Sequence, residues 1–317
     1  MVRAGYQAER GRRLPLHVLE TASVIPDSRL PRLSLGIEAG GVPYAVVVND
    51  VPVWADRLGH AATIDGFPVL EWLVPGANTL EIRLGLSIEP NAISAGSVDV
   101  ELRCDLDGDD SPLALTSLSL SPTTVGGAPA GRFAIEGAPG NQSLAATPTG
   151  DIVIEPIRLG SGSTSADRRV LRTIQLPWRW PRWRHFDAPT IIASGRTQAS
   201  LEESYRQMWN LLRANDRARL VEFLAVKVAE LVAANPKDRR HIEPILGLED
   251  CLDDPEMALK PLTLESTRLE IAGGGSLARL VDARGNGPIV FVHRDGLMSI
   301  CLDTMFCMGS SGWVLVR

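Results

Sequence analysis

The stretch Thr79-Leu80-Glu81-Ile82-Arg83-Leu84 alternates polar and apolar side chains, which is the period of a β-strand with one buried and one solvated face. Residues 98–104 repeat this alternation, with Asp99, Glu101 and Arg103 between apolar neighbours. Other short apolar runs cover residues 44–48, 51–54, 113–120, 133–135 and 152–157, and Pro-Gly and Gly-Gly pairs lie between them. Many short strands with turns between them predict a jelly-roll-like β-sandwich over residues 1–160.

A helical period replaces this alternation after residue 198. Apolar side chains from Leu201 to Leu212 fall on one helical stripe, and Ser200 and Glu203 predict its N-terminal cap. Asn215-Asp216 interrupts the stripe before a second amphipathic stretch, residues 220–232. Strand patterns follow at 262–271, 277–281, 289–293, 298–302 and 313–316. Residues 198–317 therefore predict an α+β domain with two helices packed on an antiparallel sheet.

The segments Val48-Asn49-Asp50-Val51-Pro52-Val53 and Glu71-Trp72-Leu73-Val74-Pro75-Gly76-Ala77-Asn78-Thr79-Leu80 carry a family resemblance. Residues 44–84 resemble the galactose-binding-like jelly-roll modules attached to many glycoside hydrolases. That resemblance implies a sandwich and carbohydrate binding, with Asn49, Trp54, Trp72 and Asn78 as candidate ligand-binding residues. The element order of residues 198–317 resembles nuclear transport factor-like cone folds.

The charge is distributed unevenly along the 317 residues. The chain has 32 Lys and Arg and 38 Asp and Glu, a net charge of −6, of which residues 1–160 carry −8, residues 161–219 carry +6 and residues 220–317 carry −4. Residues 161–197 form an aromatic-basic joint that includes a candidate last sandwich strand at 169–175. Its candidate interface residues are Trp178, Arg179, Trp180, Arg182, Trp183 and Arg184. We expect this segment to pack the two domains together, or alternatively to bind an external protein or nucleic acid.

The sequence shows no cofactor or metal motif. Its four cysteines form no CxxC pair, which fits a reducing compartment and predicts a cytoplasmic protein. The acidic run from Asp105 to Asp110 lacks the Gly and Glu of a calcium loop and predicts a turn. No leader peptide and no apolar run long enough to span a membrane is expected.

No catalytic signature surrounds the histidine and cysteine residues near the C-terminus. His293-Arg294-Asp295, with Cys301 nearby, predicts a hairpin turn, and Asp282, His293 and Asp303 are candidate pocket residues only. We therefore expect a noncatalytic binding protein, such as a bacterial accessory or immunity-type protein that recognises another protein. The alternatives are a carbohydrate-binding protein, which exposed Trp54 or Trp72 would favour, and an enzyme with its pocket in the C-terminal domain. A nucleic-acid or membrane partner is not expected.

Overall fold

The computed structural model describes residues 31–56, 59–84, 96–106, 113–125, 128–136, 147–148, 153–158, 164–176, 183–234, 245–310 and 312–316. These residues form two compact units, and each is described by itself. One unit holds the described residues up to Leu176, and the other holds those from Trp183 onward. The calcium-loop candidate beyond Leu106 and the segment from Trp178 to Arg182 lie outside the described residues.

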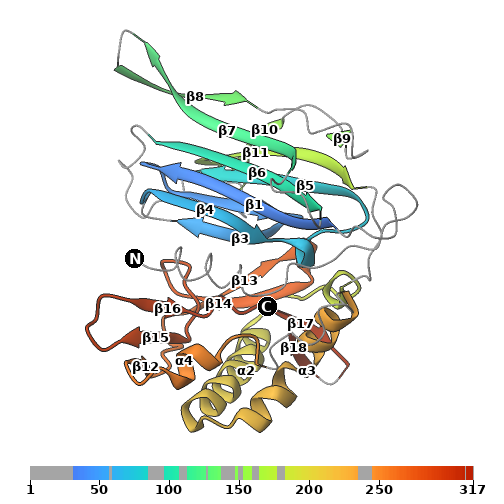
Figure 1. Ribbon diagram of the computed structural model, residues 1–317, viewed down its shortest axis with the longest axis vertical. Coiled ribbons are helices and arrows are strands. Elements are labelled where there is room, and N and C mark those ends of the chain that lie inside the picture. The colour runs from blue at the N-terminus through green and yellow to red at the C-terminus, as the bar shows by residue number, and fades with distance from the viewer. Residues whose placement is uncertain are drawn as a thin grey trace. The chain divides into compact units, whose positions relative to one another are not determined.

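The N-terminal unit is a sandwich of two antiparallel sheets (Figure 1). The first sheet has the order β4-β1-β6-β7-β8, with β4 at Ala62–Pro68, β1 at Pro31–Gly40, β6 at Ser97–Leu106, β7 at Leu113–Val125 and β8 at Ala128–Glu136. Strand β6 contains the predicted alternation: Val98, Val100, Leu102 and Cys104 are buried, whereas the residues between them are partly exposed. Strands β1 and β4 were not predicted.

The second sheet of the sandwich has the order β10-β11-β5-β2-β3, and β9 pairs with β11. Its strands are β10 (Val153–Arg158), β11 (Thr164–Leu176), β5 (Gly76–Leu84), β2 (Tyr44–Val48), β3 (Val51–Asp56) and β9 (Thr147–Pro148). A short 3-10 helix, η1 (Leu70–Trp72), precedes β5. Strand β11 places residues 169–175 in this sheet beside β5. The predicted sandwich is thus confirmed, although its strands are longer than the apolar runs suggested.

The C-terminal unit contains the two predicted helices. They are α2 (Gly195–Ala214) and α3 (Arg217–Ala234), and the buried residues of α2 include Leu201, Tyr205 and Met208. The predicted cap at Ser200 is wrong, because α2 begins one turn and a half earlier and Ser194 accepts a hydrogen bond from Thr197 N at 3.0 Å. Asn215 ends α2 in the left-handed conformation.

The sheet of this unit is divided in two. One sheet has the order β12-β15-β16 and the other β13-β14-β17-β18. The elements are α4 (Glu249–Asp253), β12 (Met257–Leu259), β13 (Arg268–Ala272), η5 (Gly273–Gly275), β14 (Leu277–Val281), β15 (Val290–His293), β16 (Ser299–Cys301), β17 (Phe306–Gly309) and β18 (Gly312–Leu315), with η3 (Arg184–Phe186) preceding α2. The predicted strand 262–271 is therefore only half correct, since its first half precedes β13 as a loop.

Side chains from both helices and both sheets form one apolar core in this unit. It includes Tyr205 and Leu212 of α2, Leu224 of α3, Phe291 of β15 and Phe306 of β17. Tyr205 and Phe306 have ring centroids 5.2 Å apart. The α+β architecture predicted from the change of period is confirmed. Among the described residues, no helix has the length and apolar composition needed to cross a membrane.

Candidate functional site

The two asparagines of the jelly-roll-like segment link the β2–β3 turn to the start of β5. Asn49 and Asp50 both have positive φ, 48° and 63°, and form the two-residue turn between β2 and β3. Asn78 is 1% exposed and uses all four hydrogen-bonding positions of its amide. Its Nδ2 donates to Val74 O and Gly76 O, and its Oδ1 accepts from Val74 N and from Asn49 Nδ2 at 2.7–2.9 Å. These contacts leave the Asn78 amide no hydrogen bond for a ligand.

The two candidate tryptophans lie inside the sandwich. Trp54 is 6% exposed, donates its Nε1 hydrogen to the Tyr44 hydroxyl at 3.2 Å and meets the Phe67 ring edge-on at 5.9 Å. Burial raises the pKa of Tyr44 to about 12. Trp72 is 1% exposed. Neither indole presents a face on which a sugar ring could stack.

Of the candidate interface residues in the aromatic-basic joint, Trp183 and Arg184 are described. Trp183 is buried, and Lys227 Nζ of α3 lies 5.4 Å from its ring centroid. Arg184 is exposed, and Glu230 of α3 accepts a hydrogen bond from its backbone N–H at 2.9 Å. This end of the joint therefore packs on a helix of the C-terminal unit.

The three candidate pocket residues have three different partners. Asp282 caps the β14–β15 turn by accepting from Arg284 N and Asn286 N, both at 2.8 Å. His293 Nδ1 lies 2.9 Å from Asp295 in the β15–β16 hairpin. The Asp303 side chain is 5% exposed and accepts from Arg279 Nη1 at 2.7 Å. No described contact brings Asp282, His293 and Asp303 together.

Arg279 and Tyr205 are two of the polar side chains buried in the C-terminal unit. Arg279 is 4% exposed and also donates to Glu270 at 2.6 and 3.0 Å. Burial disfavours its charge, but Asp303 and Glu270 outweigh this effect and raise its pKa above the usual value. The Tyr205 hydroxyl donates to Thr304 O at 3.0 Å and accepts from Leu280 N at 3.2 Å. Arg279 and the Tyr205 hydroxyl thus each find their hydrogen-bond partners within the C-terminal unit.

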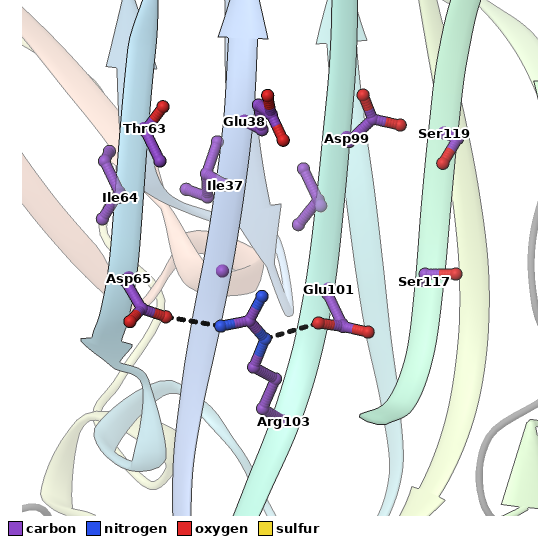
Figure 2. Close-up of a pocket in the computed structure, with 12 residues that line it drawn as sticks. Ile37, Glu38, Thr63, Ile64, Asp65, Asp99, Glu101, Arg103, Ser117 and Ser119 are labelled. Carbon is purple, nitrogen blue, oxygen red and sulfur yellow. Dashed lines mark hydrogen bonds and ion pairs between the residues drawn. The ribbon is translucent and has the colours of Figure 1, made fainter. Parts of the chain in front are cut away.

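A groove of about 660 Å³ lies on the outer face of the first sandwich sheet. Its polar lining comes from four adjacent strands (Figure 2): Thr63 and Asp65 of β4, Glu38 of β1, Asp99, Glu101 and Arg103 of β6, and Ser117 and Ser119 of β7. Four carboxylates and one guanidinium give this lining a net charge of 1 − 4 = −3. Because side chains alternate along a strand, these groups share the face opposite the core.

One half of the groove contains a closed set of ion pairs. Arg103 reaches Asp65 of β4 through Nη1 and Glu101 of its own strand through Nε (Figure 2). A β-bulge places Asp65, because Asp65 and Gly66 together lie opposite Gly36 of β1, and Gly66 has a φ of 74°. Partial burial lowers the pKa of Arg103, but Glu101 and Asp65 more than offset this and raise it.

The other half of the groove contains two carboxylates directly opposite each other. Glu38 of β1 and Asp99 of β6 are cross-strand partners, and Thr63 and Ser119 flank them in the next strands. Glu38 is exposed and Asp99 is partly exposed. Neither carboxylate has an ion pair within the described part of the chain. Like charges directly opposite in a sheet destabilise it.

Sequence reasoning identified one wall of this groove without identifying the groove. The alternation around Asp99, Glu101 and Arg103 predicted a solvated strand face. A second wall comes from the predicted strand β7, but β1 and β4, which supply the rest, were not predicted. The register of β1 with β6 joins residues about sixty positions apart. The inward alternation of Leu33, Leu35 and Ile37 was the available signal for β1.

A metal centre is not assembled by the described residues: among them, no three His, Cys, Asp or Glu side chains gather as ligands. The four cysteines are free thiols. Burial, with the nearby Glu230 carboxylate, raises the pKa of Cys307 to about 11, so this thiol is not activated as a nucleophile.

Comparisons with protein-family models, with curated proteins and with solved structures give no match for this chain.

Proposed function

We propose that the protein is a noncatalytic binding protein whose sandwich recognises a partner protein through the groove on the first sheet. The observation that carries this proposal is the Glu38–Asp99 pair, two directly opposed carboxylates that form no ion pair with any residue the structure describes. An opposed pair of like charges costs about 0.2–1 kcal/mol of sheet stability. A basic side chain of a partner, placed between the two carboxylates, would relieve that repulsion.

The surroundings of the pair suit a lysine or arginine donor. The lining has a net charge of −3 and attracts a basic segment over several ångströms. Thr63 and Ser119 offer hydroxyl oxygens at the two ends of the same row. The pair lies on an antiparallel sheet, so its two carboxylates are held at a fixed spacing before a partner arrives.

The two alternative functions lack comparable support among the described residues. Carbohydrate binding rested on Trp54 and Trp72, which are buried, and on Asn78, whose amide is saturated. Catalysis in the C-terminal unit rested on Asp282, His293 and Asp303, which have separate partners.

Affinity capture with charge-matched variants tests the proposal. The full chain and its Glu38→Gln/Asp99→Asn variant are used as baits in extract from the cell of origin, at low and high salt. Glu222→Gln/Glu265→Gln, which removes two exposed charges from the C-terminal unit, is the control. A partner that the wild type and the control retain at low salt, and that the groove variant loses, is expected. Equal recovery of every partner by the groove variant would contradict the proposal.

A further inference from the structure

Arg103 lies flat across strand β1, and a glycine makes this path available. A Cβ atom on Gly36 would lie 2.6 Å from both Cζ and Nη2 of Arg103. Only glycine at position 36 leaves room for the Arg103 guanidinium, because any side chain with a Cβ atom would overlap it. The sequence thus places a glycine inside a strand where an arginine crosses it.

This path gives Arg103 both carboxylates on its side of the groove. It pairs with Asp65 across β1 and with Glu101 along β6, while the row two residues further along holds Glu38 and Asp99. Two residues along a strand span about 7 Å. A second cation near Asp65 and Glu101 would meet the Arg103 charge at close range, whereas the Glu38–Asp99 row contains no basic side chain.

We propose that Arg103, lying on Gly36, is a positioning residue that confines the partner's basic side chain to the Glu38–Asp99 row. This inference rests on the proposed function. Arg103 occupies the competing carboxylates and repels a second cation, so the groove offers one cation position in place of two.

Amide chemical shifts of the full chain, titrated with Nα-acetyl-L-arginine amide at low ionic strength, test this assignment. The uncharged Nα-acetyl-L-citrulline amide is the control ligand. In the wild type, we expect shifts at Glu38 and Asp99 with the arginine probe only. The Glu38→Gln/Asp99→Asn variant should weaken that binding about tenfold, as expected for losing two partly exposed ion pairs.

Removing Arg103 should make a second cation position available, between Asp65 and Glu101. In the triple variant Arg103→Met/Glu38→Gln/Asp99→Asn, the probe should bind again, with shifts now at Asp65 and Glu101. Gly36→Ala in the background of the Glu38 and Asp99 changes should do the same, because its Cβ displaces only the end of a flexible side chain. Gly40→Ala of the same strand, where the nearest atom lies at 3.4 Å, is the control and should not restore binding.

The two proposals fail in different ways. A wild type without arginine-specific shifts at Glu38 and Asp99 overturns the proposed function. The role of Arg103 is overturned if the wild type binds the probe at Glu38 and Asp99 but neither the triple variant nor the Gly36→Ala variant binds it at Asp65 and Glu101. The proposed function then remains. Restored binding in the Gly36→Ala variant alone supports the role of Arg103, since that variant retains the arginine.

Discussion

Replacing Asp303 by Asn should destabilise the C-terminal unit by about 3 kcal/mol. Asp303 and Arg279 are each 5% exposed at their side chains, and their atoms lie 2.7 Å apart. Removing one partner of a buried ion pair leaves a charge without compensation and costs about 3–5 kcal/mol. We expect the lower end of that range, because Glu270 still accepts from Arg279 at 2.6 and 3.0 Å.

Hydrogen exchange read by mass spectrometry measures this loss separately in the two units. Peptides of α2, β14 and β17 should exchange faster in the variant, whereas peptides of β1 and β6 serve as an internal reference. Glu265→Gln, an exposed change in the same unit, should stay within about 0.5 kcal/mol of the wild type. Although burial disfavours its charge, Asp303 and Glu270 raise the pKa of Arg279 above its usual value, so the stability that the ion pairs contribute is fully present below that usual value and is lost only as the pH rises further, toward the raised pKa.

A double-mutant cycle separates the ion pair from its surroundings. The combination Arg279→Met/Asp303→Asn should be less destabilised than the sum of the two single changes, because it leaves no buried charge of this pair uncompensated. Additive losses, or an Asp303→Asn variant as stable as the wild type, would refute the assignment of Asp303 to a buried structural pair.

Three further changes follow from the same contacts. Glu38→Gln should stabilise the sandwich by about 0.2–1 kcal/mol, because it removes a like-charge pair. Slower hydrogen exchange in β1 and β6 would confirm this gain, and a loss of stability would contradict it. Asn78→Ala should lower the free energy of unfolding, measured by urea denaturation, by about 2–3 kcal/mol, because it leaves Val74 N and Val74 O without their partner. An unchanged free energy of unfolding would mean that the turn does not need these hydrogen bonds. Tyr205→Phe should cost about 1–2 kcal/mol, measured by thermal unfolding. Because burial raises the pKa of Tyr205 from 10.0 to about 12, the wild type should lose more stability between these pH values than Tyr205→Phe, in which only the other raised groups, such as Tyr44 and Cys307, still contribute. Identical alkaline profiles of the two proteins would exclude a contribution of Tyr205.

Local patterns were sufficient to predict the elements that bury one face. The helical stripe of Leu201, Tyr205 and Met208 becomes the buried face of α2, and the alternation from Val98 to Cys104 becomes β6. The start of α2 was mispredicted, because Ser194 and Ser200 both resemble caps and only the fold selects between them.

The groove was beyond such reasoning, because its geometry depends on pairing between distant strands. Gly36 illustrates the difficulty. A glycine inside a strand indicates a bulge or a close approach, but the group that approaches is Arg103, which lies on a different strand. The opposition of Glu38 and Asp99 likewise follows from the register of β1 with β6, which no local pattern specifies.

The contacts of Asn49 and Asn78 explain why resemblance in this segment says more about fold than about ligand. Asn49 holds a left-handed turn position, donates to Trp72 O at 2.7 Å and accepts from Thr79 N at 2.9 Å. The Asn78 amide is saturated by Val74 and Gly76 of its own turn and by Asn49. A sandwich that needs this hairpin beside this turn selects those residue types for backbone reasons alone. Such a motif can recur among sandwiches with unrelated ligands. We propose that binding specificity comes from positions that the backbone leaves free, and on the first sheet of this sandwich those positions include the outward-facing side chains around Glu38 and Asp99.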